Sequence, residues 1–551
     1  MTNRLLKAAS DQELLLRYSR VLEQQKGYED LPGSRYLGDQ GKMLLKYKIR
    51  IKDALYASFT AEKDAGEPLF KENTRIDFSS WQISYHGVGK VQQLVLGDYT
   101  LQFGQGLSLW SGFGYGKGAD VTTLAKNDAG LKPYTSANEL SFLRGLAIVL
   151  SPFKYITVTA FRSSLKQDAS LRTQSDGSTA MITLSESGLH RTASELKNKD
   201  DVIQNIYGSV VQYRSSDLEM GFSGYRSAYT QPFITGNALY NQNNFVGSKL
   251  TNTSFSYNYT FKNLYLYGET AKSFPGGWSI LNGLLGTLSK RISVGLMQRL
   301  YGKNHYTFLS RSLGEGSNSI NEQGWYAGLN WQLNNHLLLS IASDKFKFLA
   351  PKYRIDDSSS GYEHLAQLNY NPAKTLKLLA RVKLESKAQN GDSPGNLAEI
   401  QKWSIRLNIN WQANAKLGMD GRIEKVHYRK AALNEDGLLI YHDINYKLLK
   451  SLKMTGRLAW FKTDSYNSRL YAYEDDVLYS SGFGLYQGHG FRTYLNLGYT
   501  PIRSNRNAAR LSVYIRYSLS LYPGETTVGS GLDIITGNRK SELKLQARIQ
   551  I

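Results

Sequence analysis

The segment from Gly104 to Gly118 is the most unusual part of the sequence, because six glycines fall within it. Glycines at this density permit tight or left-handed backbone, and Lys117 suggests a loop that binds phosphate. The spacing of a phosphate loop fails, since Ser111 stands where its first glycine belongs and Gly118 where a Ser or Thr belongs. The segment therefore does not predict a nucleotide site.

Motifs for hydrolysis are also missing. The stretch GFSGY at 221–225 lacks the G-x-S-x-G order of a nucleophile elbow, and no H-E-x-x-H motif occurs. The 8 histidines are scattered along the chain, although Ser, His and Asp from distant segments can meet in a folded protein. The sequence favours a protein that is not an enzyme, with a hydrolase assembled from distant segments as the least favoured alternative.

Two acidic clusters could supply oxygen ligands for Ca²⁺, namely Asp356-Asp357 and Glu474-Asp475-Asp476. Solvated carboxylates in loops explain both clusters more simply. The chain contains no cysteine, which removes disulfides and thiolate metal sites. No metal, cofactor or catalytic residue is therefore predicted.

The elements that must position any functional residue are β-strands. From Trp403 to Gln412, five apolar residues alternate with five polar ones, which is the period of a strand with two different faces. About ten residues are also the length that a tilted strand needs to cross a bilayer. Because Trp403 and Trp411 stand at the two ends of the apolar face, we expect both rings in the lipid-facing girdles at the membrane interfaces.

Such strands follow one another along residues 41–551, which we predict to be a transmembrane β-barrel. No apolar run is long enough for a transmembrane helix. Short turns such as 262–263 alternate with long segments such as 164–201, as is typical of outer-membrane barrels. The fold class is an all-β membrane protein, a single closed antiparallel barrel of about 20–24 strands. We expect the strands at 43–51 and 543–551 to pair and close it.

Residues 1–40 are predicted to form a helical, periplasmic segment before the barrel. Ser10 and Glu13 have the spacing of a capping box, and Gly27 suits the end of a short amphipathic helix. Residues 1–10 have no apolar core of a signal peptide, so we expect further chain before residue 1. The apolar residues at helical spacing are Leu14, Leu15, Tyr18, Val21 and Leu22.

Inside a barrel, the glycine-rich segment has two interpretations. It folds into the lumen as a constriction or plug, which wide barrels often need, or it is an ordinary extracellular loop. The residues of this candidate plug loop are Gly104, Gly106, Trp110, Gly112, Gly114, Tyr115, Gly116, Lys117 and Gly118.

The polar faces of the clearest strands are strongly basic, in a chain whose net charge is +21. A basic wall attracts anions by focusing the electric field and by presenting rings of charged side chains. The alternative is a lumen filled with ion pairs and water that conducts nothing. The predicted basic lumen face consists of Lys46, Lys48, Arg50, Lys52, Lys377, Arg381, Lys383, Arg406, Arg422, Lys453, Arg457, Arg516, Lys544 and Arg548.

Several strings carry a resemblance to a known family. They are LLLRYSRVLEQQKGY (14–28), TAEKDAGE (60–67), LGDYTLQFGQGLSLWSGFGYGK (96–117), PYTSANE (133–139), FLRG (142–145), YEDDVLY (473–479) and GSGLDIITGNRKSELKLQ (529–546). In these strings the chain resembles a bacterial outer-membrane β-barrel family whose longer members carry an N-terminal helix-hairpin-helix domain. The resemblance covers nearly the whole barrel and implies DNA contact in the longer members. That module is not in this sequence, so none of its DNA-binding glycines transfers to a residue here.

Barrel, charge and resemblance together predict a porin-like channel or transporter in the outer membrane of a Gram-negative bacterium. The expected substrate is anionic, with nucleic acid as one candidate. The alternatives are a plugged barrel that serves as a binding or assembly scaffold for partner proteins, and a membrane-embedded hydrolase. We expect a monomeric barrel whose partners are outer-membrane lipids, lipopolysaccharide, and nucleic acid or other anions.

Overall fold

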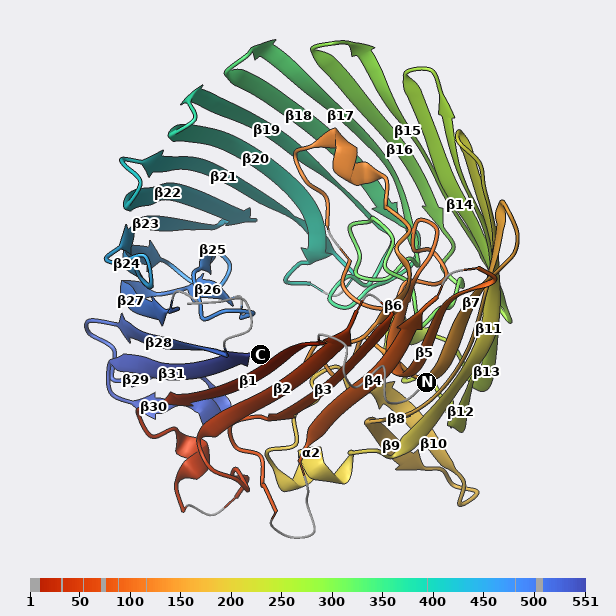
Figure 1. Cartoon of the computed structure of the whole chain (residues 1–551), viewed down its shortest axis with the longest axis horizontal. Helices are drawn as coiled ribbons and strands as arrows, with labels where there is room; N and C mark the ends of the chain where they lie inside the picture. Colours follow the sequence, from red (N-terminus) through yellow and green to blue (C-terminus); the bar gives the residue numbers. More distant parts are fainter. Residues whose placement is uncertain are drawn as a thin grey trace.

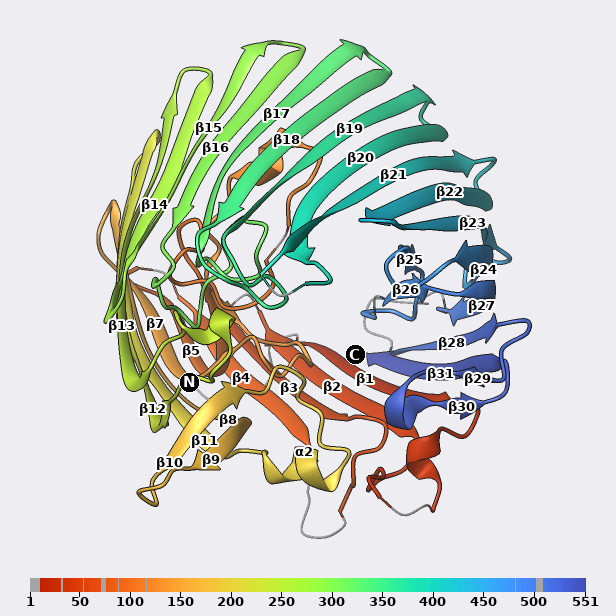
Figure 2. The same cartoon turned by 180° about the vertical axis from the view of Figure 1, so that it is seen from behind.

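The computed structural model describes residues 10–30, 33–52, 54–70, 76–87, 89–114, 116–393, 395–480, 482–501 and 509–551. Antiparallel strands dominate these residues and surround a central space (Figures 1 and 2). The one α-helix among them is the short α2 (Ala193–Lys197). No helix in the described part of the chain is long and apolar enough to cross a membrane.

Within the described residues, 24 strands form the barrel, each hydrogen-bonded to two neighbours. They are β1 (Ser10–Val21), β2 (Gly41–Ile51), β3 (Leu55–Lys63), β4 (Phe78–His86), β5 (Val91–Gln102), β7 (Leu143–Phe153), β8 (Ile156–Gln167), β11 (Val202–Arg214), β12 (Leu218–Phe233), β13 (Gly247–Phe261), β14 (Leu264–Phe274), β15 (Trp278–Ser289), β16 (Ile292–Tyr301), β17 (Glu322–Asn334), β18 (Leu337–Phe348), β19 (Ser359–Ala373), β20 (Leu376–Asn390), β21 (Leu397–Gln412), β22 (Leu417–Lys430), β23 (Leu433–Lys447), β24 (Leu452–Thr463), β27 (His489–Tyr499), β28 (Arg510–Leu521) and β31 (Arg539–Gln550).

Shorter elements lie in the connections between these strands. They are the 3₁₀ turns η1 (Lys26–Tyr28), η2 (Val121–Leu124), η3 (Leu239–Asn241) and η4 (Gly531–Asp533), and the strands β6 (Gly130–Pro133), β9 (Ala169–Thr173), β10 (Thr179–Leu184), β25 (Leu470–Glu474), β26 (Gly482–Tyr486), β29 (Thr527–Val528) and β30 (Ile535–Thr536).

The predicted N-terminal helix is wrong, because residues 10–21 form strand β1. In β1, Leu15 is fully buried while the next residue, Leu16, is 45% exposed, so the side chains alternate with the period of a strand. The consecutive residues Leu14, Leu15 and Leu16 fit the period of a helix and the period of a strand equally well. The sequence pattern therefore predicted a helix where the chain forms a strand. A short isolated helix is marginal in water, whereas β1 satisfies its backbone groups on two neighbouring strands.

β1 also changes how the barrel closes. The prediction that residues 43–51 pair with the last strand is wrong, since β1 lies between them and pairs with both β2 and β31. Leu16 lies opposite Leu45 on one side and Ala547 on the other. The barrel is therefore closed by the first and last described strands, and the first of them begins at Ser10 rather than after residue 40.

The outer face of the barrel is apolar. On β21, Ile405, Leu407 and Ile409 are exposed by 45%, 51% and 45%, and they alternate with inward polar residues. A closed barrel with an apolar outer belt is the architecture by which outer-membrane proteins face lipid, and the described strands have this architecture. Exposed apolar side chains recur around it at Phe59, Ile83, Leu96, Leu146, Val211, Phe222, Phe255, Leu296, Ile341, Val382, Ile423, Ile440, Leu458, Leu495, Ile515 and Leu545.

The two rims of the barrel differ. One rim has mostly short turns, such as 262–263 and 335–336, and the described chain begins and ends there, at Ser10 and Ile551. The other rim carries most of the long connections, including 103–142, 168–201 and 464–488. In outer-membrane barrels the short turns face the periplasm and the long loops face the exterior.

Part of the interior is filled by two long connections. The residues of the first, 103–142, include η2, which contacts β15, β16 and β17 and is drawn inside the ring of strands in Figure 1. Val121 and Leu124 of η2 are buried in one cluster with Tyr267 and Tyr326 of the strands and Leu313 of the second connection, 302–321. An apolar core therefore lies between these loops and the inner wall.

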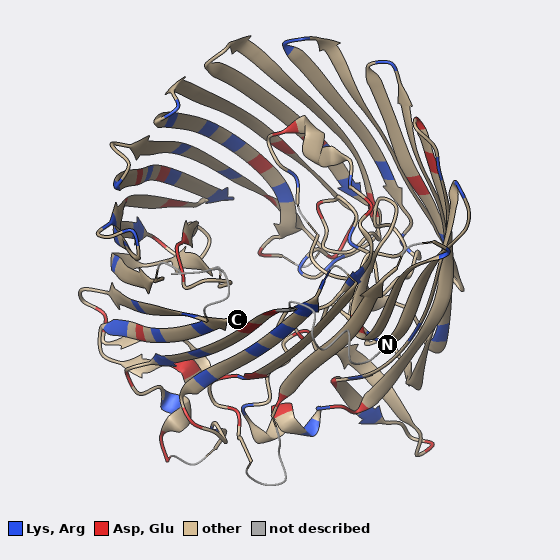
Figure 3. Ribbon diagram, viewed as in Figure 1, with Lys and Arg blue, Asp and Glu red and all other residues tan. Residues whose placement is uncertain are grey.

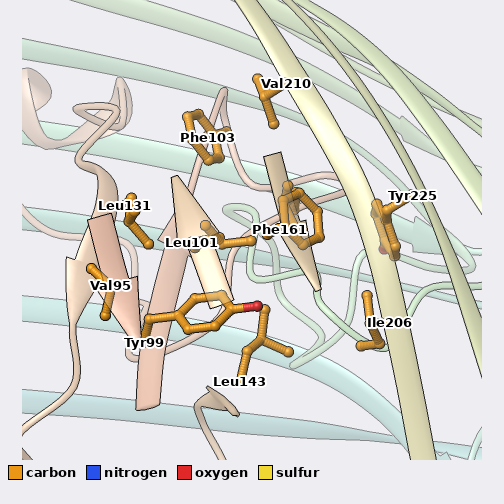
Figure 4. Close-up of a cluster of buried hydrophobic side chains, with 12 residues drawn as sticks. Val95, Tyr99, Leu101, Phe103, Leu131, Leu143, Phe161, Ile206, Val210 and Tyr225 are labelled. Carbon is orange, nitrogen blue, oxygen red and sulfur yellow. The ribbon is translucent and has the colours of Figure 1, made fainter. Parts of the chain in front are cut away.

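A second cluster packs the same loop, 103–142, against strands β5, β8 and β12. Phe103 lies with Leu101, Phe161 and Tyr225, which come from β5, β8 and β12 (Figure 4). The hydroxyl of Tyr225 donates a hydrogen bond of 2.8 Å to the backbone carbonyl of Ser108. Loop 103–142 is thus held to the wall from β5 to β17.

Candidate anion site on the lumen wall

The candidate plug loop lies inside the barrel and is tied to β14. The backbone N–H groups of Gln105 and Leu107 donate to the carboxylate of Glu269 at 2.8 and 3.0 Å. Gly104 has a φ of +61° and passes so close that a Cβ there would lie 2.8 Å from Glu269 Oε2. The same segment contains the other described plug-loop residues, which are Gly106, Trp110, Gly112, Gly114, Gly116, Lys117 and Gly118; Tyr115 lies outside the described residues.

Lys117 belongs to a buried ion-pair network. Its Nζ lies 2.6 Å from Asp344 and 2.7 Å from Glu315. Arg299 donates to Asp344 at 2.7 Å and to Glu322 at 2.5 Å, and its side chain is fully buried. The charge of Lys117 is therefore neutralised within the protein.

Several predicted basic lumen residues are paired with acids of the strands themselves. Arg457 donates two hydrogen bonds of 2.6 Å to Asp443 on the neighbouring strand. Arg548 donates from Nε to Glu13 of β1 at 2.8 Å. These two cations have bidentate or short contacts and are not free to meet a solute.

Two further basic residues are neutralised by an inserted segment, 464–488, which contains the β25–β26 hairpin. Glu474 accepts a hydrogen bond of 2.7 Å from Arg516, and Asp476 accepts one of 2.6 Å from Lys544. The acidic cluster noted in the sequence thus binds side chains of the wall. The stretch from β24 to β31 is basic in sequence but compensated in structure.

The stretch from β20 to β22 is different, because three arginines, Arg381, Arg406 and Arg422, lie near one carboxylate, Glu424, which pairs with two of them. Arg406 lies 2.7 Å from Glu424 and Arg422 lies 3.5 Å from it. Arg381 lies directly opposite Arg406 in the strand register and donates from Nε to Gln367 at 2.8 Å. We call Arg381, Arg406 and Arg422 the arginine wall; its charge, with Glu424, sums to +2.

The hydrogen-bonding capacity of the arginine wall is not used up. Among the described residues, the buried Nε atoms of Arg406 and Arg422 have no hydrogen-bond partner. Figure 3 shows basic positions recurring on these strands. Arginine presents donors in a fork that matches carboxylate and phosphate oxygens. The arrangement can therefore bind or guide anions.

Two lysines flank the arginine wall on β20. Lys383 lies 3.1 Å from Glu363 and 3.0 Å from Glu385, so its charge is compensated. Lys377 lies opposite Asn410 and makes no ion pair within 4.0 Å among the described residues. Uncompensated charge on β20 therefore extends from the arginine wall toward the short-turn rim.

The basic face predicted on β2 is partly compensated. Lys48 lies 3.8 Å from Glu13, and Arg50 lies over the ring of Tyr56, 5.7 Å from its centroid. Lys46 has no acid within 4.0 Å in the described part of the chain. A pocket of about 450 Å³ is lined by Glu13, Lys48, Arg50 and Tyr56, among others.

The remaining predicted positions lie near strand ends or on the outer face. Lys52 follows the end of β2 with a φ of +50°, and Lys453 is the second residue of β24. Trp411 is 45% exposed on the outer face, next to the end of β21. Trp403 stacks on His427 of β22, with ring centroids 5.4 Å apart.

Two features escaped the sequence interpretation. The first is the neutralisation of the β24–β31 wall by segment 464–488. The second is a buried histidine, His190, held between Asp77 and Asp168 at distances of 2.8 Å. No sequence signal could have found it, because its partners lie 113 and 22 residues away.

No protein-family model and no curated relative matches the chain. Among solved structures it is similar to the siderophore receptor PirA from Pseudomonas aeruginosa, with 8% identity and a TM-score of 0.46 over 98% of this chain and 81% of that one. It is also similar to the PirA of Acinetobacter baumannii, with 9% identity and a TM-score of 0.44 over 98% and 81%. The copper transporter OprC gives 8% identity and a TM-score of 0.44 over 98% and 83%. At these values the likeness supports no statement about substrate, and the helix-hairpin-helix relationship predicted from the sequence is not shown.

Proposed function

We propose that this outer-membrane barrel is a channel or transporter for anionic solutes, guided by the arginine wall. The observation that supports it is that Glu424 pairs with Arg406 and Arg422, while Arg381, opposite Arg406, has no ion pair among the described residues. Like charges on facing strands destabilise a sheet unless something compensates them. An anion in the lumen supplies that compensation, and the focused positive field raises its local concentration.

Nucleic acid is one candidate substrate. The net charge of +21 supports binding to a polyanion, and each phosphate neutralised by Arg or Lys releases counterions. Nucleic-acid binding therefore has to weaken steeply between low and high salt. Binding of DNA that does not change with salt would exclude the arginine wall as its site.

The test is ion selectivity in a planar bilayer. The wild-type protein is expected to give a reversal potential on the anion side under a salt gradient. Arg381→Gln, Arg406→Gln and Arg422→Gln together are expected to abolish this preference. Lys425→Gln is the matched control, because Lys425 lies on β22 but faces outward and is exposed. Cation selectivity in the wild type would overturn the proposal.

A plugged barrel that acts as a scaffold is the second candidate. Loops 103–142 and 302–321 build an apolar core against the inner wall, and segment 464–488 covers the wall from β24 to β31. If the barrel conducts no ions while correctly folded, these segments close it and the scaffold function is favoured. Its lipid and lipopolysaccharide partners would then contact the outer face and rim.

A further inference from the structure

A second polar site lies on the long-loop rim, away from the arginine wall. It is built from the ends of separate connections: Glu67 and Asp77 from the β3–β4 connection, Asp168 directly after β8, and His190 just before α2. Glu67 is 1% exposed and His190 is 3% exposed. Ionisable groups buried this deeply need partners to offset the loss of hydration.

The geometry around His190 matches a metal site. One ligand atom each from Glu67, Asp77 and His190 lies within 4.8 Å of the others. His190 Nδ1 lies 2.8 Å from Asp77 Oδ2, and Nε2 lies 2.8 Å from Asp168 Oδ2. A histidine whose other ring nitrogen donates to a carboxylate is the usual arrangement around metal-binding imidazoles. Asp168 therefore orients the ring through Nε2, and Nδ1 faces the Asp77 carboxylate, between which atoms a metal ion could be shared.

The charges of this site do not balance. Four carboxylates, those of Glu67, Asp77, Asp168 and Glu139, lie around His190, and Lys199 is the cation in direct contact with them. A divalent cation would remove this excess of negative charge.

Other cations nearby are already engaged. Arg144 donates to Asp98 at 2.6 Å, and Lys166 lies 3.7 Å from Asp200. Lys199 differs from these two cations because it pairs with a residue of the site itself: its Nζ contacts the Asp77 carboxylate. Its side chain is 25% exposed, so the flexible lysine can turn into solvent when another cation arrives.

We propose that Glu67, Asp77 and His190 bind a divalent transition-metal cation such as Zn²⁺ or Mn²⁺, with Asp168 holding the imidazole in place. One imidazole with carboxylates suits these ions, whereas Ca²⁺ and Mg²⁺ prefer oxygen ligands alone. A pocket of about 430 Å³ adjoins the site and is lined in part by Glu139, His190 and Lys199. It gives the ion an entry path and leaves room for water ligands.

The experiment uses the full chain in detergent, stripped with a chelator and titrated with Zn²⁺, Mn²⁺, Ca²⁺ and Mg²⁺ by calorimetry. One equivalent of Zn²⁺ or Mn²⁺ is expected to bind, more tightly than Ca²⁺ or Mg²⁺. Asp77→Asn and His190→Ala are each expected to weaken binding at least tenfold. Asp436→Asn is the matched control, because the exposed His427–Asp436 pair (3.0 Å) has one carboxylate only.

Lys199→Met separates a metal site from a purely structural ion-pair cluster. Removing the competing ammonium group is expected to increase metal affinity several-fold. Asp168→Asn leaves all three ligands in place and is expected to weaken binding about tenfold, which keeps the test open if His190→Ala does not fold. Absence of a bound equivalent, preference for Ca²⁺, or lower affinity in Lys199→Met would overturn the proposal.

Discussion

Two stretches of the lumen wall are equally basic in sequence but differ in how many carboxylates compensate their basic side chains. From β24 to β31, Arg516 and Lys544 receive carboxylates at 2.7 and 2.6 Å from segment 464–488. From β20 to β22, Glu424 is the one ion-pair partner of the arginine wall among the described residues, and segment 464–488 offers Arg422 a backbone carbonyl, that of Tyr471, instead of a carboxylate. The strand sequences alone do not distinguish the two stretches. The position of segment 464–488 decides which stretch has its basic side chains compensated within the protein and which stretch can bind an anionic solute.

The difference has energetic consequences. A buried cation that loses its only acid is left without hydration and without a partner, which is costly. A cation beside water or a mobile anion loses much less, because the solvent screens it. The same change of charge is therefore expected to have large effects on the β24–β31 wall and small ones on the arginine wall.

The largest effect is expected for Glu474→Gln. This change leaves Arg516 and Arg492 without the carboxylate that both contact, and the free energy of unfolding is expected to fall by about 3–5 kcal/mol. Thermal unfolding in detergent, followed by the heat-dependent shift on electrophoresis, measures it. Asp475→Asn removes the same charge from the same segment, but no ion pair of Asp475 occurs among the described residues. Equal losses of unfolding free energy in Glu474→Gln and Asp475→Asn would mean that the ion pairs of Glu474 do not stabilise the β24–β31 wall.

A smaller effect is expected on β21, where the outer and inner faces can be compared at adjacent residues. Leu407→Arg places a charge on the exposed apolar face and is expected to cost about 2–4 kcal/mol at the membrane midplane. Asn408→Arg adds a cation opposite Arg422 on the inner face, where water or anions can compensate it, and is expected to cost much less. Folding yields in lipid with urea titration measure both. If Asn408→Arg lowers the free energy of unfolding as much as Leu407→Arg does, water and anions do not reach the arginine wall.

The barrel itself was predictable from sequence, because strands such as β21 and β31 alternate strictly between apolar and polar residues. β1 was not, since Leu14, Leu15 and Leu16 fit the helical and the strand period alike. Its identity depends on pairing with β31, more than 500 positions away in the chain. Local periodicity carries no information about such a distant partner.

The site was predictable only in part. Alternation assigns Arg406 and Arg422 to the polar face, opposite to Leu407, but it cannot show which acids reach them. Glu474 contacts Arg516 across 42 residues, and Glu67 contacts the backbone of His190 across 123 residues. Both contacts depend on how long connections fold over the rim, and no short-range rule fixes that path.

The smallest effect has the opposite sign and is expected for Arg381→Gln. Arg381 and Arg406 are directly opposed like charges, and such a pair costs about 0.2–1 kcal/mol. Glutamine at this position removes the repulsion and can still hydrogen-bond to Gln367, so the unfolding midpoint in detergent is expected to rise slightly. The gain should shrink at high salt, because screening weakens the repulsion that is being removed.

Arg457→Gln is the control from the compensated wall: it breaks the bidentate contact with Asp443 and is expected to lower the midpoint. If Arg381→Gln lowers the midpoint as much as Arg457→Gln does, Arg381 is a structural residue, and the arginine wall would be retained for stability rather than for anions. A slight gain in stability together with a loss of anion selectivity would instead mean that the wall keeps an unfavourable charge for its function.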